Sequence, residues 1–443
     1  MTGMAGGHTM GRSCSGLLGP TPFAAIGARS GACCNKESAM AAIVVSKYKE
    51  ADEFLRNATL KQGLYDEGAI LMKDVLVNLF GEEHAARRHL AQKLFRREYF
   101  RNYERRIFPK TIEETLVPFV QAGGGDLADF GYHVLMNLTA DASGIDRPLR
   151  TREETATMLR MIKSFSKAAT LGQLTMVDMG DKEAIRKEII DTLEEFDQVF
   201  YTPSETRRRA LLDRVERGEM PESEMPRDLL TILLRNEDNI ELPRDKMLKE
   251  TAYFLFVGAL STTHALTHAM QHIFTWRAEH PKDNELLKEA WFLQRCVWES
   301  LRLHPPTPEL NRKLTCPVRI KSRPETFESG DLIVDMFKVN QDPLMFGFDT
   351  EAFNPHRATP PQGWLYGVTF GLGTHACLGR ILVAGTPIQP GSDLKDAEYG
   401  NMYLIARALL DRGARPDPAN PPTMDTSNTR RNWLTYPFLL DKG

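Results

Sequence analysis

One cysteine in the C-terminal part of the chain lies in a turn that is rich in glycine. The stretch FGLGTHACLG, residues 370–379, places Cys377 after Gly371 and Gly373 and before Gly379. Glycine is favoured where a backbone bends tightly or comes close to another group. A helix is expected directly after the cysteine, and a helix N-terminus stabilises a thiolate. The pattern predicts that Cys377 binds a metal against a bulky ligand; a buried structural thiol is the alternative.

Two other polar patterns have spacings that suit a functional site. The segment ESLR puts Glu299 and Arg302 on one face of a helix, where a surface ion pair is the simpler explanation. The segment GEEHAARR puts His84 and Arg88 at positions i and i+4, which is also typical of a solvated basic helix. Neither pattern alone indicates a function.

A long helix is expected at residues 244–278, because this stretch has no proline and has polar ends around an apolar centre. Helices average about 11–12 residues, so a helix of this length must cross the whole domain. Its centre, VGALSTTHA, contains Ser261 and Thr262. His264 and His268 lie one turn apart on it, but no HExxH motif is present, so we expect core or surface histidines rather than a metal pair.

The Cys377 turn resembles the haem-thiolate signature of the cytochrome P450 family. The FxxGxxxCxG spacing of that family is matched by Phe370, Gly373, Cys377 and Gly379. This motif is specific, because its spacing fixes both the glycines and the cysteine.

Motifs upstream of the turn follow the order that the family has. ESLR, at residues 299–302, resembles the buried ExxR pair, and Arg357 in FNPHR resembles the arginine that binds it. NQDPLMF, at residues 340–346, resembles the stretch between them. The shared order is a stronger signal than any single motif.

The resemblance implies a mainly α fold with a small β region, the cytochrome P450 fold, with the long helix crossing the haem. It implies one haem-thiolate domain at residues 37–443, while residues 1–36, which lack Asp and Glu, are expected to be a disordered tail. Cys377 would be the axial ligand of haem b. Further expected cofactor contacts are His84, Arg88, Arg312 and His375 at the propionates, and Phe370, Gly371, Gly379 and Ala259 at the porphyrin.

The proton relay departs from the family pattern. In the family the long helix carries an acid followed by a threonine, which pass protons to bound dioxygen. Thr262 aligns with the threonine, but Ser261 stands where the acid is usual. A serine hydroxyl does not titrate near neutral pH, although it can donate and accept within a water chain. Both residues are the expected catalytic pair, and the departure leaves open a peroxide-using or non-oxygenating haem-thiolate enzyme.

A second departure follows the cysteine. In the family a long helix continues from this point, but here Pro387, Pro390 and Gly391 interrupt it. We expect a short helix at residues 378–384, an inserted loop, and a new helix at residues 397–412.

The remaining elements are predicted from hydrophobic periodicity and turn residues. A capping box at Thr111 marks one start. The absence of alternating strands and helices disfavours a Rossmann sheet. Helices are expected at residues 46–57, 82–95, 111–123, 126–143, 152–169, 182–200, 204–217, 228–236 and 285–303, with short strands in CPVRIKS and DLIVDMFKV.

Composition restricts the class of protein. The chain has 443 residues and a net charge of −3, which argues against a globally basic nucleic-acid-binding protein. It has no apolar run long enough to span a membrane. Its six cysteines include no CxxC pair, which suits a reducing compartment. We expect a cytoplasmic protein, with organelle targeting by the acid-free N-terminus as the alternative.

By resemblance, the expected function is oxidation of a hydrophobic small organic molecule by a haem-thiolate monooxygenase. Its expected partners are dioxygen and a ferredoxin or flavodoxin with an NAD(P)H reductase, and a monomer is expected. The basic run at residues 87–106 is either a docking face for an acidic donor or a solvated face. A haem-binding protein without turnover is the alternative. The pocket is expected at residues 60–80, 257–261, 306–310 and 430–433.

Overall fold

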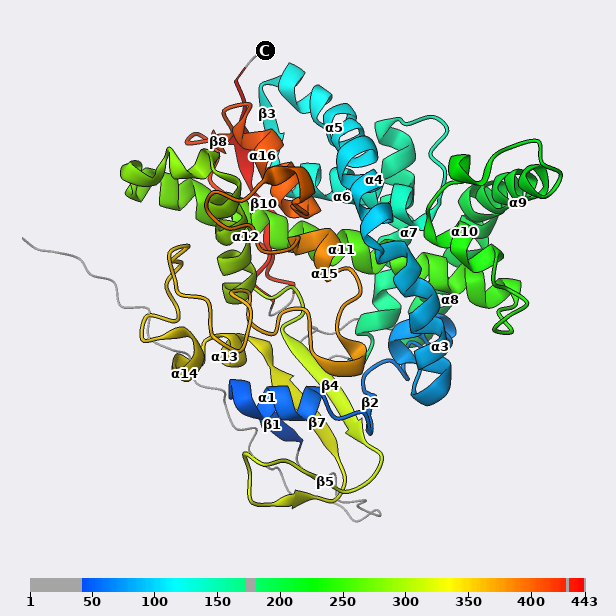
Figure 1. Ribbon diagram of the computed structural model, residues 1–443, viewed down its shortest axis with the longest axis horizontal. Coiled ribbons are helices and arrows are strands. Elements are labelled where there is room, and N and C mark those ends of the chain that lie inside the picture. Colours follow the sequence, from blue (N-terminus) through cyan, green and yellow to red (C-terminus); the bar gives the residue numbers. More distant parts are fainter. Residues whose placement is uncertain (1–41, 173–180, 428–429, 442–443) are drawn as a thin grey trace, which may run out of the picture. The chain divides into compact units, whose positions relative to one another are not determined.

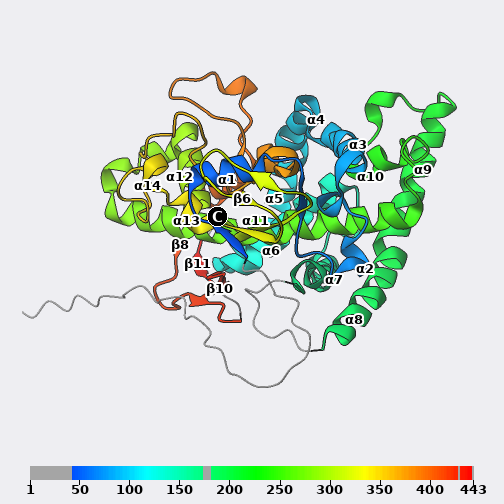
Figure 2. The same ribbon diagram turned by 90° about the horizontal axis from the view of Figure 1, so that it is seen from below.

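The central element is one long helix, α11 (Arg244–Glu279), which runs across the domain (Figure 2). In the computed structural model, which describes residues 42–172, 181–427 and 430–441, it begins after Pro243 and ends at Glu279, two residues before Pro281. Its apolar faces pack on α6 (Leu127–Ser143), α7 (Arg152–Thr170) and α12 (Ala290–Leu303).

α11 and α6 approach closely because a glycine lies between them. A Cβ added at Gly258 would lie 2.8 Å from Cγ2 of Thr139, on α6. Only glycine fits so close a crossing without displacing a neighbour.

Helices make up most of the described residues, and none of those helices is both long and apolar enough to cross a membrane. The predicted tail at residues 1–36 lies outside the described residues. The other α-helices are α1 (Tyr48–Leu55), α2 (Ala69–Met72), α3 (Gly81–Ala91), α4 (Arg97–Asn102), α5 (Phe108–Ala122), α8 (Lys182–Phe196), α9 (Thr202–Glu216), α10 (Leu229–Leu234), α13 (Met336–Asn340), α14 (Pro343–Phe346), α15 (Arg380–Ala384) and α16 (Asn401–Leu410).

The capping box predicted at Thr111 is wrong. α5 begins at Phe108, so Thr111 lies within the helix, and its hydroxyl donates to the Asp141 carboxylate at 2.7 Å. Pro109 lies at the start of α5, directly after the π-helical turn Tyr103–Ile107, so the helical path continues through it from α4. Side-chain caps do occur elsewhere, for example at Asp126 before α6 and at Thr151 before α7.

The β structure is small and divided among four sheets. The largest has the strand order β1 (Ile43–Val45), β7 (Asp331–Asp335), β4 (Glu309–Leu314) and β2 (Leu60–Gln62), and only the β1–β7 pair is parallel. It lies below the helices in Figure 1. The smaller sheets contain β3 (Gly124–Asp126), β11 (Pro437–Leu439) and β8 (Arg415–Pro416); β9 (Thr423–Met424) and β10 (Trp433–Thr435); and β5 (Val318–Arg319) and β6 (Thr326–Phe327).

The predicted fold class, mainly α with a small β region, is confirmed. One strand is shorter than predicted, because DLIVDMFKV divides into β7 and the helix α13. The Asp335 carboxylate at their junction accepts a hydrogen bond from the backbone N–H of Lys338, which caps α13.

The second half of α11 carries a stack of histidines. The ring of His268 lies 4.0 Å from that of His304, which follows α12, at an interplanar angle of 4°. His272 lies 5.0 Å from the same ring, and its Nδ1 is 3.0 Å from the Ser300 hydroxyl. Desolvation is the main cause that lowers the pKa of His268 to about 2, of His272 to about 3 and of His304 to about 4. These residues are therefore neutral core side chains at neutral pH.

The stack should make the protein sensitive to acid. The folded-state pKa values lie below the ordinary 6.5, so the unfolded chain binds more protons as the pH falls below that value, and stability is lost. Between pH 7.5 and 5.5, protonation of the unfolded chain should cost about 1.4 kcal/mol of stability for each of the three histidines. Urea unfolding at pH 7.5 and 5.5 should therefore show a loss of about 4 kcal/mol from the stack.

The variant His268→Phe keeps an aromatic ring and should reduce that loss by about a third. His89→Gln, which changes an exposed histidine of α3, is the control and should behave as the wild type. An equal pH dependence in His268→Phe and the wild type would contradict this explanation.

Candidate functional site

The Cys377 loop is shaped by two glycines in the left-handed region. Gly371 has a φ of 65° and Gly373 a φ of 71°, which L-residues with a Cβ rarely adopt. A Cβ at Gly373 would also lie 2.3 Å from the carbonyl oxygen of Leu55, at the end of α1. The backbone N–H of Cys377 donates to the carbonyl of Phe370 at 2.7 Å and closes the loop.

The Cys377 side chain is accessible and yet closely surrounded by protein. Desolvation by the surrounding protein raises the pKa of the thiol. Hydrogen bonds from the backbone N–H groups of Gly379 and Arg380, with the charges of Arg88 and Arg380, act in the opposite direction and lower the pKa. The loop thus combines burial with groups that stabilise a thiolate.

The four residues predicted to bind propionates come together beside this loop. The rings of His84, on α3, and His375 lie 4.1 Å apart. Arg88 donates from Nη2 to the carbonyl of Ala376 at 2.5 Å. Desolvation first, then the charges of His84, Arg312 and Arg88, lowers the pKa of His375 to about 3.

Arg312 and His84 show that this cluster is desolvated. The pKa of Arg312 is lowered to about 10 by burial, and its guanidinium donates to the side-chain oxygen of Gln62 on the neighbouring strand. The Nε2 atom of His84 is buried and has no hydrogen-bond partner among the described residues. A cluster of basic groups that repel one another in a desolvated place fits a ligand with carboxylates.

Other predicted cofactor contacts are placed as follows. The Phe370 ring packs edge-on against Tyr366, at 5.0 Å between centroids. A Cβ at Gly379 would touch only the sulfur of Cys377, at 3.8 Å, so packing within the described protein does not require glycine there. Ala259 is fully buried in the core of α11.

The predicted catalytic pair lies on α11. Thr262 is buried, with 4% of its surface exposed, and Ser261 is half-buried. The Ser261 hydroxyl donates to the carbonyl of Val257 at 2.6 Å. Its proton is therefore held by the helix, while its oxygen lone pairs remain able to accept.

Two tyrosines were missed in the sequence. Desolvation raises the pKa of Tyr253, on α11, and Tyr65, and the charge of Cys377 contributes to the shift at Tyr253. Tyr65 lies within electrostatic reach of Arg312. No spacing pattern predicts these positions, because α11 and the segment after β2 meet only in the fold.

A buried triad connects α12 to the segment that leads to the loop. The Glu299 carboxylate accepts from Arg302 at 2.8 and 2.9 Å and from Nε of Arg357 at 2.9 Å. Glu299 and Arg302 are fully buried, and Arg357 is 5% exposed. The triad therefore replaces the surface ion pair that was the simpler explanation of ESLR.

Asn340 extends this network to the cysteine loop. Arg302 donates to its carbonyl at 2.9 Å. Its side-chain amide accepts from the backbone N–H of Val368 at 2.8 Å and donates to the hydroxyl of Thr369 at 2.9 Å. Gly367 has a φ of 64°, and a Cβ there would collide with the Asn340 amide at 2.2 Å. The C-terminal end of α12 and the loop are thus held in one hydrogen-bonded frame.

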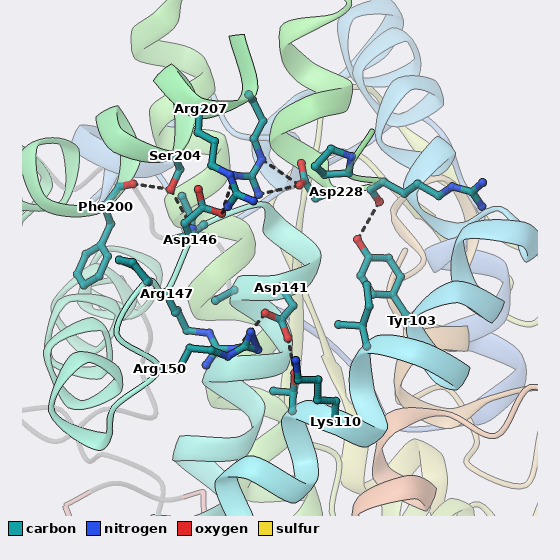
Figure 3. Close-up of a pocket in the computed structure, with 18 of the residues that line it drawn as sticks. Tyr103, Lys110, Asp141, Asp146, Arg147, Arg150, Phe200, Ser204, Arg207 and Asp228 are labelled. Carbon is teal, nitrogen blue, oxygen red and sulfur yellow. Dashed lines mark hydrogen bonds and ion pairs between the residues drawn. The ribbon is translucent and has the colours of Figure 1, made fainter. Parts of the chain in front are cut away.

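A large open cleft lies away from this site (Figure 3). It has a volume of about 1510 Å³ and lies between the α4–α5 region, the end of α6 and α9. Ion pairs line the cleft: Arg147 binds Asp141 at 2.9 Å, and Arg208 binds Asp228 at 2.9 Å. None of the predicted site residues lines it, so volume alone does not locate the chemistry.

Comparison with known proteins extends these observations. Residues 283–383 match the family model described as Cytochrome P450. Human Cytochrome P450 4F2 is 26% identical over 180 residues, which are 34% of this chain and 34% of that protein. Cytochrome P450 734A2 of Oryza sativa subsp. japonica is 25% identical over 209 residues, 38% of this chain and 37% of that protein. The chain thus spans about a third of the length of these curated relatives.

Solved structures resemble the chain over most of its length. CalO2 has a TM-score of 0.68 at 18% identity, with 90% of this chain and 91% of that chain covered. CYP109E1 from Bacillus megaterium has a TM-score of 0.65 at 16% identity, with 90% and 92% covered. The fold of the chain is thus shared with these solved structures. The family match over residues 283–383 and this shared fold confirm the predicted resemblance to the cytochrome P450 superfamily.

The residues present fit a haem. The sulfur of Cys377 is accessible yet desolvated by protein, and His84, with its unpartnered Nε2, lies with the basic cluster that suits two propionates. The room beside Gly379 suits a flat group that lies against the loop. The donor set therefore provides one soft axial ligand and several partners for carboxylates.

Removal of the charge at Glu299 should destabilise the fold strongly. In Glu299→Gln the two buried arginines would share an uncharged partner, and breaking a buried ion pair costs about 3–5 kcal/mol. Urea unfolding measures this loss. The control Glu285→Gln breaks an exposed pair with Lys288 at the same i, i+3 spacing and should cost less than about 1 kcal/mol. Equal losses in the two variants would show that the triad does not stabilise the frame.

Proposed function

We propose that the chain is a haem-thiolate monooxygenase that uses haem b and dioxygen to oxidise a hydrophobic small molecule. The observation that carries the proposal is the surroundings of Cys377, whose sulfur is accessible yet desolvated by protein and receives hydrogen bonds from the N–H groups of Gly379 and Arg380. Bound haem with a thiolate ligand would supply dioxygen activation and oxygen insertion into a C–H bond.

The protein residues would bind and orient the cofactor. Cys377 would supply the sulfur that binds the haem, with its loop held in shape by Gly371 and Gly373. His84, Arg312 and His375 would hold the propionates. Arg88, which already bonds the carbonyl of Ala376, would join the propionate site to the cysteine loop.

Protons would reach the distal side through Thr262 and water. Ser261 cannot store a proton near neutral pH, and its own proton is directed to the carbonyl of Val257. It would therefore act as an acceptor in a water chain rather than as an acid. The missing acid is also the feature that favours the second candidate, a haem-thiolate enzyme that uses peroxide or does not insert oxygen.

The substrate would enter a pocket formed by residues 60–80, 257–261, 306–310 and 430–433. Tyr65 adds a polar group to this mainly apolar wall. Similar structures contain different ligands: CYP109E1 holds corticosterone, and P450BioI holds an acyl carrier protein ligated with hexadec-9Z-enoic acid. We therefore propose only a hydrophobic organic substrate, with electrons from a ferredoxin or flavodoxin and its reductase. A cytoplasmic location and a monomer stay predictions.

Isotopic labelling distinguishes the two candidates. A substrate found by a ligand-induced shift of the haem absorption band is turned over under ¹⁸O₂ with a ferredoxin, its reductase and NADPH. A monooxygenase should place one labelled atom in the product and the other in water. Product that forms only with added peroxide, or that carries no label, would contradict the proposal.

The variant Ser261→Asp tests the relay. A carboxylate at this position can titrate and pass protons, so the product formed per NADPH consumed should rise by about two-fold or more. Ser261→Asn has similar size without a titratable proton and is the matched control. An unchanged or lower yield in Ser261→Asp would show that the hydroxyl at this position does not limit proton delivery.

A further inference from the structure

A loop that follows the cysteine helix is built as a rigid unit. Its neck is closed by a hydrogen bond from the N–H of Thr386 to the carbonyl of Glu398, at 2.8 Å. Gly385 and Gly400 flank the neck with φ values of 73° and 83°. A Cβ at Gly385 would lie 2.3 Å from the carbonyl oxygen of Glu398. We call residues 385–400 the clamped loop.

The inner side of the clamped loop is attached to α12. The amide of Gln294 donates to the carbonyl of Thr386 at 2.9 Å and accepts from the N–H of Ile388 at 3.0 Å. The Trp298 indole donates to the carbonyl of Ala384 at 2.7 Å. The loop is therefore held at its base, while its tip, residues 389–396, is exposed. The loop projects beyond the helices, in orange, in Figure 2.

The outer side is attached to α4 by charge. Arg101 binds the Asp396 carboxylate at 2.5 Å. Arg97 lies 3.4 Å from the Glu398 carboxylate and donates to the carbonyl of Asp396 at 3.3 Å. Arg105 donates to the carbonyl of Lys395.

The basic run at residues 87–106 is therefore engaged in part, while Arg96 and Arg106 are exposed. Arg87 is buried and binds Glu250, and Arg88 is turned toward the cysteine loop. The arginines of α4 that remain accessible are already engaged by the clamped loop. A docking face and a solvated face both stay predictions for the run as a whole.

The clamped loop is close to Cys377 in the sequence. α15 begins three residues after Cys377, and it ends directly before the clamped loop. A donor on the cysteine side would reach the metal by the shortest covalent path, through the sulfur. The arginines of α4 already bind carboxylates, those of Asp396 and Glu398. They can therefore also bind the carboxylates of an acidic partner.

We infer that the clamped loop is an internal competitor for an acidic one-electron donor protein of the ferredoxin type. Carboxylates of the donor replace Asp396 and Glu398 on Arg97 and Arg101 when the two proteins dock. The loop thus restricts electron entry to donors with enough negative charge to displace it. Each delivery oxidises the donor by one electron and reduces the haem iron by one. The inference rests on the proposed function for the electron step, but not for docking.

The variant Asp396→Asn tests the competition by releasing the tip from Arg101. Asp396 is 69% exposed, so the variant should fold normally. Calorimetric titration with a plant-type [2Fe–2S] ferredoxin at low salt should show a Kd lower by about three-fold or more, because a surface cation is freed for the partner. The salt dependence of binding should become steeper, since more exposed charges take part.

Two matched variants complete the test. Asp393→Asn removes the same charge from the same loop, at a residue that bonds the N–H of Lys395 and no arginine, and should bind as the wild type. Arg101→Gln also releases the tip but removes the cation, so its Kd should rise. If Asp396→Asn and Asp393→Asn bind the ferredoxin equally, the loop does not compete.

The electron step is measured as the rate at which the ferredoxin reduces the haem under carbon monoxide. The rate of reduction by dithionite, which needs no docking, is the comparison. Asp396→Asn should accelerate the ferredoxin reaction by about three-fold and leave the dithionite reaction unchanged. If neither reductant yields a thiolate-type carbonyl band, the proposed function fails. The calorimetric result then still decides whether the loop competes for docking.

Discussion

The site depends on keeping one sulfur atom both enclosed by protein and able to carry negative charge. Burial raises the pKa of the Cys377 thiol, so enclosure alone would favour the neutral form. The N–H groups of Gly379 and Arg380 oppose this effect, and they point at the sulfur because Gly371 and Gly373 bend the loop through the left-handed region. The two glycines therefore contribute indirectly to the pKa of the Cys377 thiol, because they set the shape of the loop.

The frame around the loop converts this local arrangement into a fixed position. The Glu299 carboxylate holds Arg302 and Arg357, and Arg302 reaches Asn340, which binds the backbone just before the loop. α11, which carries Thr262, crosses the domain as one uninterrupted helix. The fold thus holds the cysteine loop in a fixed frame and provides one long helix for the residues predicted to act with it.

The sequence predicted the elements that repeat a strong local pattern. The long helix, the cysteine turn and the interruption at Pro387 could all be found from composition and spacing. Features that depend on contacts between distant segments could not be predicted in this way. The role of Gly258 against α6, the position of Tyr253 near the sulfur, and the pairing of Arg101 with Asp396 require segments far apart in the chain to meet.

The carbon monoxide spectrum of the reduced protein tests the central claim most directly. Wild type and Cys316→Ser, which changes an exposed cysteine, should both show a thiolate-type absorption band. Cys377→Ser should lose this band while it still folds, as circular dichroism would show. A band that persists in Cys377→Ser, or that is absent from the wild type with bound haem, would contradict the account.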